Sequence, residues 1–192
     1  FFDLYNTVVH FHPPKEELQK AACREFGIEV APHGILRGYV GADEYMAKEN
    51  ARLPLAHRSA QARKDFFAEY ESLILAGAGV HVARSLASQI FVRMRQLPYD
   101  LAVYDDVLPA LDMLKMRGLT LGLISNLRGD IDGLCQRLRL TPPLDFVVTS
   151  EKVGAEKPHA PIFLAALEKA DVAPEEAIHV GDQYQSDIVG AR

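Results

Sequence analysis

Short apolar stretches that end abruptly in polar or acidic residues constrain the fold of this chain most strongly. Three of them lead directly into polar side chains: Asp3 follows residues 1–2, Ser125-Asn126 follow residues 119–124, and Gly181-Asp182 follow residues 177–180. The two longer stretches have the length and composition of buried strands. In an open α/β sheet, ligands bind beyond the carboxyl ends of the strands. The pattern therefore predicts that these polar ends meet at one site.

Periodicity divides the chain into two kinds of structure. Residues 13–98 have a helical pattern, and we expect helices at residues 15–26, 42–53, 59–75 and 82–97. Beyond residue 98 helices and strands alternate, with helices expected at residues 105–117, 131–138 and 161–170, and strands at residues 119–124, 146–149 and 177–180. This alternation is typical of a parallel sheet. We therefore expect a discontinuous α/β core, residues 1–12 and 99–192, with a helical domain at residues 13–98 inserted after the first strand.

Composition and charge argue against several classes of protein. The 192 residues are 48% hydrophobic, which is ample for a packed core, and the net charge of -5 argues against nucleic acid as the partner. Cys23 and Cys135 lack the spacing of a disulfide framework or a zinc site. No apolar run approaches the roughly 18 residues of a membrane helix, and no secretory signal is visible. We expect a cytoplasmic protein with a small-molecule substrate and without nucleic-acid or membrane partners.

Both ends of the chain look truncated. Phe1-Phe2 is short for the strand that should precede Asp3, since strands typically run about 5–6 residues. Residues 186–192 have the pattern of the start of a helix, after which a doubly wound sheet would continue with another strand. We therefore expect most of a domain, with the segments of the site all present.

A magnesium ion is expected at the site because three carboxylates converge there. Asp3, Asp182 and Asp187 would repel one another without a cation between them. Magnesium takes oxygen ligands in an octahedron and usually keeps several waters. We expect Asp3, Asp182 and the main-chain carbonyl of Tyr5 to bind it, with Asp187 binding directly or through water. Together with Lys157, these groups describe metal-assisted phosphoryl transfer.

These motifs and their order resemble the haloacid dehalogenase (HAD) superfamily of hydrolases: Asp3-Leu4-Tyr5-Asn6-Thr7, then Ser125-Asn126, then Lys157-Pro158, then Gly181-Asp182 with Asp187. The resemblance implies a HAD-like fold, a Rossmann-like parallel core with an inserted helical-bundle cap that closes over the site and selects the substrate. It also implies that Asp3 is the nucleophile and that Thr7 steadies the turn. The residues expected to bind the substrate are Thr7, Ser125, Asn126 and Lys157, and Lys157 would also offset the charge of the nucleophile and the phosphate.

Tyr5 separates the possible functions. Most HAD phosphatases carry a second aspartate at this place as general acid and base, whereas a phenol, with a pKa near 10, is a poor base. Tyrosine there is similar to the 2-haloacid dehalogenases, which displace halide from carbon without a metal, but their last motif is rich in Ser and Asn where this chain has Asp182. We expect a magnesium-dependent phosphatase of a small phosphorylated metabolite, with Asp3, Tyr5 and Lys157 as catalytic residues. The alternatives are a dehalogenase that uses Asp3 as nucleophile, and a HAD-derived binding or regulatory module with little turnover.

Overall fold

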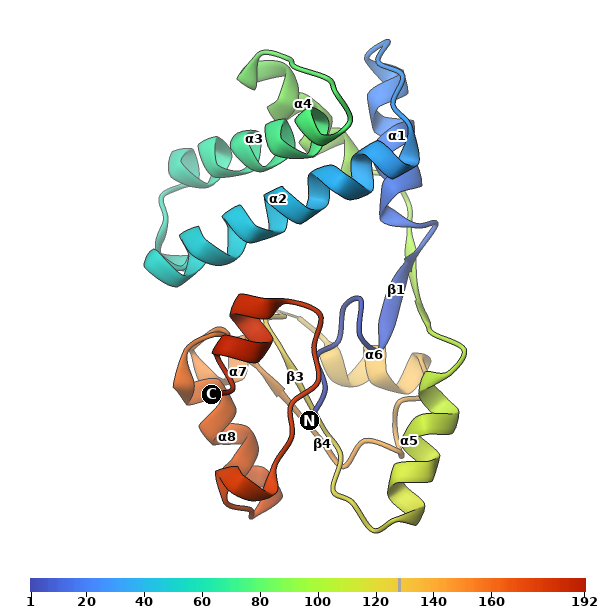
Figure 1. The fold of residues 1–192 in the computed structure, drawn as a ribbon, viewed down its shortest axis with the longest axis vertical. Coiled ribbons are helices and arrows are strands. Elements are labelled where there is room, and N and C mark those ends of the chain that lie inside the picture. Colours follow the sequence, from blue (N-terminus) through green and yellow to red (C-terminus); the bar gives the residue numbers. More distant parts are fainter. Residues whose placement is uncertain (128) are drawn as a thin grey trace. The chain divides into compact units, whose positions relative to one another are not determined.

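The chain divides into two compact units in the computed structural model (Figure 1), which describes residues 1–127 and 129–192, the side chain of Ala56 excepted. Unit 1 comprises residues 1–10 and 101–192, and unit 2 comprises residues 11–100. A two-stranded sheet of β1 (Val9–His12) and β2 (Asp100–Val103) lies at the two points where the chain passes from one unit to the other.

Unit 1 is built on parallel strands. β3 (Gly122–Ser125) pairs in parallel with β4 (Phe146–Thr149), and Ser125 lies opposite Thr149. Phe2 forms parallel bridges to Leu123 on one side and to Val180 on the other. The expected strand at residues 177–180 is thus represented by this single bridge. The first segment of the chain therefore lies between a segment from the middle of the sequence and one from near its end.

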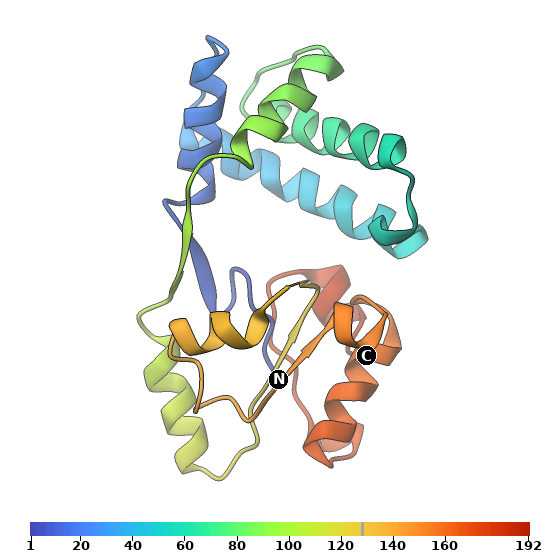
Figure 2. The ribbon, with the colours of Figure 1, turned by 180° about the vertical axis from the view of Figure 1, so that it is seen from behind.

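Helices cover both faces of these strands. α5 (Val107–Met116) and α6 (Ile131–Arg137) lie on one side, and α7 (Ser150–Val153) and α8 (Ala160–Ala170) lie on the other (Figures 1 and 2). Leu123 and Ile124 are both fully buried and belong to different apolar clusters, the first with residues of α5 and α6 and the second with residues of α8. Side chains alternate between the faces of a strand, so a continuous apolar run is what a strand buried on both faces requires.

The last part of unit 1 contains two short elements. The 3₁₀-helix η2 (Pro174–Glu176) precedes the segment that reaches Val180. The π-helix η3 (Tyr184–Val189) follows Asp182, at the place where we expected the start of a helix. Asp187 lies within η3 and is buried. One of the expected metal ligands is therefore positioned by this short helix.

Unit 2 is helical and has its own apolar core. Its helices are α1 (Lys15–Glu25), α2 (Pro32–Arg52), α3 (Ala60–Gly77) and α4 (Arg84–Met94), with the 3₁₀-helix η1 (Leu55–His57) between α2 and α3. Ile35 of α2, Ile74 of α3 and Ile90 of α4 are fully buried in this core. Ser59 caps α3, since its side chain accepts a hydrogen bond from the amide of Ala62 at 3.2 Å.

The expectation that the second helix begins at residue 42 is wrong, because α2 begins at Pro32. Proline is well suited to the first turn of a helix, where its missing N–H is not needed. Gly38 lies directly against α3: a Cβ atom at this position would be 2.1 Å from the carbonyl oxygen of Ile74. Gly38 thus permits the close approach of α2 and α3.

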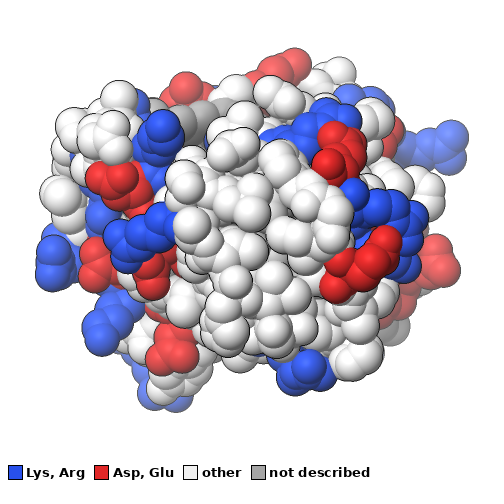
Figure 3. Space-filling view, turned by 90° about the horizontal axis from the view of Figure 1, so that it is seen from above, with Lys and Arg blue, Asp and Glu red and all other residues white. Residues whose placement is uncertain are grey.

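The surface carries charges of both signs. In the face seen in Figure 3, acidic and basic side chains border a wide uncharged area, with both signs side by side. Among the helices within the described residues, none is both long enough and apolar enough to cross a membrane.

Candidate active site

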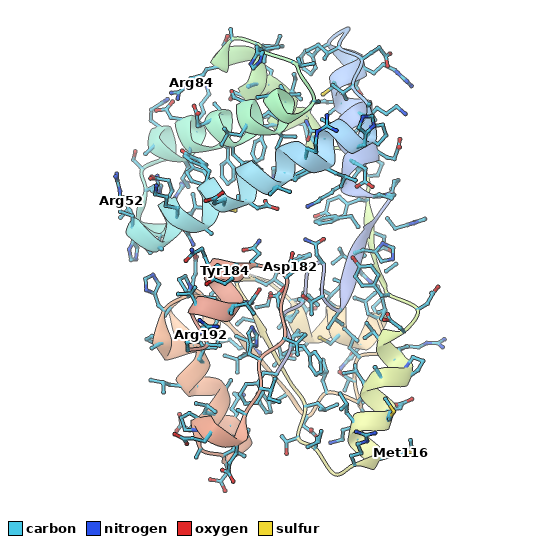
Figure 4. The ribbon with its side chains drawn as sticks, viewed as in Figure 1. Arg52, Arg84, Met116, Asp182, Tyr184 and Arg192 are labelled. Carbon is cyan, nitrogen blue, oxygen red and sulfur yellow. The ribbon has the colours of Figure 1, made fainter. Side chains whose placement is uncertain are left out.

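The polar ends of the strand segments meet at one edge of unit 1. The amide of Asp3 donates to the carbonyl oxygen of Val180 at 2.8 Å, and the amide of Ile124 donates to the carbonyl oxygen of Phe2 at 2.8 Å. Figure 4 shows Asp182 at this edge and Met116 at the opposite end of unit 1. Segments from the beginning, middle and end of the sequence therefore bring their polar side chains to the same place.

Lys157 joins two of the three carboxylates. Its Nζ atom lies 2.5 Å from Oδ1 of Asp3 and 2.6 Å from Oδ1 of Asp187, and its side chain is 3% exposed. Asp3, Asp182 and Asp187 each offer one oxygen within 4.8 Å of the others. Hydrogen bonds between ionised groups in a buried setting are short and strong, so Lys157 holds the carboxylates of Asp3 and Asp187 in a defined geometry.

Burial and charge act in opposite directions on the two buried carboxylates. Burial raises the pKa of Asp3, and the nearby charge of Asp187 adds to the rise, although Lys157 opposes it. Burial would also raise the pKa of Asp187, but hydrogen bonds from His179, Lys157 and the amide of Gln183 outweigh it and bring that pKa to about 2. Asp187 is therefore ionised at neutral pH. With all three carboxylates ionised, one lysine leaves two negative charges without compensation.

Asn6 holds Asp182, and this contact was not predicted from the sequence. Its Nδ2 atom donates to Oδ2 of Asp182 at 3.1 Å. Asn6 has a φ of 56°, in the left-handed region that asparagine adopts more readily than most residues. The position of Asn6 in the turn after Asp3 is the feature of the sequence that could have indicated a role for it at the site. The motif at residues 3–7 thus contributes Asn6, whose side chain orients the carboxylate of Asp182.

Asn126 contacts the main chain of Lys157 with both ends of its amide. Oδ1 accepts from the amide of Lys157 at 2.6 Å, and Nδ2 donates to the carbonyl oxygen of Lys157 at 3.0 Å. We expected Asn126 to bind the substrate, and these contacts give it a role in placing the lysine. Ser125, the preceding residue, ends β3 and is buried.

Tyr5 and Thr7 occupy the turn that follows Asp3. The ring of Tyr5 packs against the apolar cluster of unit 1 that contains Leu4 and Val8. The hydroxyl of Thr7 is buried and, among the residues that the structure describes, has no hydrogen-bond partner. The side chains of this turn therefore contribute to packing beside the carboxylate of Asp3.

Two further groups hold Asp187, and neither was predicted from the sequence. The Nε2 atom of His179 lies 3.0 Å from Oδ1 of Asp187, and the amide of Gln183 donates to Oδ2 at 3.0 Å. Every residue other than proline has a backbone amide, so the sequence does not indicate that the amide of Gln183 binds Asp187. His179 lies within the apolar run of residues 177–180, two residues before Gly181, and a polar side chain in a segment expected to be a strand was the available signal.

A family model described as haloacid dehalogenase-like hydrolase matches residues 1–192. A relative, haloacid dehalogenase-like hydrolase domain-containing protein 3 of Homo sapiens, is 29% identical over 192 residues, which cover all of this chain and 76% of that protein. Ribulose-1,5-bisphosphate 5-phosphatase of Halopiger xanaduensis is 26% identical over 195 residues, which cover 99% of this chain and 78% of that protein.

Solved structures share the fold. The HAD-hydrolase YfnB of Bacillus subtilis bound to magnesium has a TM-score of 0.64 at 18% identity, and the match covers 99% of this chain and 82% of that one. A 2-haloacid dehalogenase of Pseudomonas syringae pv. Tomato has a TM-score of 0.52 at 27% identity, with 99% and 80% covered. The mixed α/β architecture with parallel strands is therefore that of the HAD fold.

Proposed function

Because this chain belongs to the haloacid dehalogenase-like hydrolases, we propose that it is a magnesium-dependent phosphatase of a small phosphorylated metabolite that acts through an aspartyl phosphate. One observation carries the proposal: Lys157 contacts both Asp3 and Asp187, and Asp182 completes a group of three carboxylates within 4.8 Å. The relatives include a phosphatase of a phosphorylated sugar, which supports this choice of substrate class.

The donor set fits magnesium. All the candidate ligands are oxygens, and the two negative charges that Lys157 leaves match one divalent cation. Asp3, Asp182 and the main-chain carbonyl of Tyr5 would hold the ion directly. Asp187 already accepts three hydrogen bonds, so we propose that it acts through a bound water. When bound, magnesium would neutralise the charge of the carboxylates and of the phosphoryl oxygens.

The proposed reaction has two steps. A carboxylate oxygen of Asp3 attacks phosphorus, a P–O bond to Asp3 forms, and the bond to the alcohol oxygen breaks; the alcohol oxygen takes a proton from solvent water and the alcohol leaves. Water then attacks phosphorus, the bond to Asp3 breaks, and inorganic phosphate and the free carboxylate result. Lys157 and Ser125 hold the phosphoryl oxygens during both steps. Asn126 keeps Lys157 in place through the lysine main chain.

Tyr5 is proposed to act chiefly through its backbone. Its ring packs against the apolar cluster, and a phenol is a poor base at neutral pH. We therefore expect slow turnover of substrates whose leaving group needs protonation. Activated esters, whose leaving group needs little protonation, should be hydrolysed more readily.

A second candidate function is dehalogenation of a 2-haloacid, which Tyr5 and the likeness to a dehalogenase structure favour. In that reaction Asp3 would displace halide from carbon without a metal. Without a metal, the exposed carboxylate of Asp182, close to Asp3, would repel an anionic haloacid. We therefore favour the phosphatase over the dehalogenase. A binding or regulatory module that keeps the site but turns over little is the third candidate.

A panel of phosphomonoesters, assayed for phosphate release with magnesium and after chelation with EDTA, tests the proposal. We expect release that requires magnesium. The same preparations are tested for halide release from 2-chloropropionate, and the Asp3→Asn protein, purified identically, controls for contaminating phosphatases. Halide release that survives EDTA would establish the dehalogenase, whereas magnesium binding without either activity would indicate the binding module.

A further inference from the structure

We propose that His179 is a positioning residue that donates a hydrogen bond from Nε2 to Asp187 and so preserves the metal site; the inference rests on the proposed function. The two atoms, Nε2 and Oδ1, lie 3.0 Å apart. The side chain of His179 is 3% exposed and that of Asp187 is 1% exposed. Both members of the contact are thus shielded from water, where a hydrogen bond has its greatest effect on geometry.

The hydrogen bonds assign the tautomer of the neutral ring. Nδ1 of His179 is buried and has no hydrogen-bond partner among the described residues. A proton on Nε2 points at the carboxylate, and the bare lone pair then lies at Nδ1. The opposite tautomer would bury an unpaired N–H and turn a lone pair toward a negative charge, which is costly. His179 therefore acts as a fixed donor to Asp187.

Packing holds the imidazole in this orientation. The ring of Phe163 lies edge-on to it, with centroids 5.4 Å apart and planes at 85°. Phe163 belongs to α8 and to the apolar cluster that covers one face of the strands. The imidazole therefore has an apolar neighbour on α8, while its Nε2 atom reaches η3.

The other donors to Asp187 do not make His179 redundant. Lys157 shares its ammonium with Asp3 and is the group proposed to hold the phosphoryl oxygens, so its contact with Asp187 changes during the reaction. The amide of Gln183 restrains only Oδ2. His179 restrains Oδ1 from a different segment of the chain. Partners of this kind that orient the groups around a metal typically change metal affinity or activity by about 10–100-fold when removed.

Calorimetric titration with magnesium chloride tests this role. His179→Leu removes the donor and keeps an apolar side chain against Phe163, and His179→Gln keeps an N–H donor. We expect magnesium affinity to fall by about 10–100-fold in His179→Leu and to stay close to that of the wild type in His179→Gln. Ile162→Val, in the same helix and apolar cluster, is the control for lost packing: its thermal stability should fall while its magnesium affinity stays near that of the wild type.

The outcomes separate this inference from the proposed function. Wild-type affinity in a folded His179→Leu protein, or equal losses in the Leu and Gln variants, would overturn the positioning role and leave the phosphatase standing. A wild-type protein that binds no magnesium would overturn the proposed function and this inference together. If His179→Leu does not fold, as judged by near-ultraviolet circular dichroism, His179→Met takes its place in the comparison.

Discussion

Gly181 and Asp187 lie so close that no other side chain fits at position 181: a Cβ atom there would be 2.2 Å from Cγ of Asp187. The glycine before Asp182 therefore makes room for the second acidic residue of the same motif. Oδ1 of Asp187 can then reach Lys157 at 2.6 Å. This contact explains why a glycine ends the last apolar run of the chain.

Gly181→Ala should displace Asp187 and weaken magnesium binding, because the new methyl group occupies the place of the carboxylate. We expect a fall of about 10-fold or more in magnesium affinity, measured by calorimetry. Gly41→Ala in α2 is a matched control, since a Cβ atom there meets nothing within 4 Å. An unchanged affinity in Gly181→Ala would show that Asp187 does not influence the metal.

Asp3→Asn should abolish turnover and leave the fold and magnesium-dependent phosphate binding largely intact. The amide keeps the shape of the side chain but removes the nucleophilic charge, and we expect a loss of about 10³-fold or more in kcat. Phosphate release and calorimetric phosphate binding are the measurements. Asp105→Asn, at an exposed position of unit 1, is the control. Near-normal turnover in Asp3→Asn would remove Asp3 from the mechanism.

Tyr5→Asp should raise the hydrolysis of unactivated phosphomonoesters, since a positioned general acid contributes about 10²–10⁴-fold. The gain should be smaller for p-nitrophenyl phosphate, whose leaving group needs little protonation. Tyr5→Phe should cost little if only the main-chain carbonyl of Tyr5 serves the metal, and much if the phenol donates the proton to the leaving group. The measurement is kcat/KM for phosphate and halide release in folded variants. A fall in phosphatase activity in Tyr5→Asp, together with halide release by the wild type, would favour the dehalogenase.

Glu71 should make the stability of unit 2 depend on pH. It is fully buried in α3, accepts a hydrogen bond from Gln19, and has a second oxygen without a partner among the described residues. Burial raises the pKa of Glu71 to about 8. The unfolded chain releases the proton near pH 4.5, whereas the folded protein keeps it up to about pH 8. Stability therefore falls as pH rises across this window and is level above it.

Glu71→Gln should remove this part of the pH dependence, because the amide cannot ionise. From the pKa shift we expect ionisation of Glu71 to lower the free energy of unfolding of the wild type by roughly 2–5 kcal/mol between pH 5 and pH 8. Glu71→Gln should lack this decrease. Thermal unfolding followed by circular dichroism at several pH values is the measurement, with Glu44→Gln, at an exposed position of α2, as the control. Parallel profiles for the wild type and Glu71→Gln would show that Glu71 is already ionised in the folded protein.

The sequence by itself determined the HAD family, the alternation of helices and strands after residue 98, and the site segments that follow the strands. These features are local: an apolar run that ends at Ser125, or a glycine before Asp182, is visible in a few consecutive residues. The extent of α2 was less accessible. A glycine weakens a helix, and the reason for one at position 38 is its contact with the backbone of Ile74 on another helix, which the sequence does not show.

Only the tertiary structure decided which polar groups contact one another. Asn126 belongs to a predicted motif, yet its contact with the main chain of Lys157 depends on how two loops far apart in the sequence meet. The same holds for Asn6 on Asp182 and His179 on Asp187. A hydrogen bond requires donor and acceptor within about 3 Å and in the right direction, and no local pattern specifies that for segments brought together by folding.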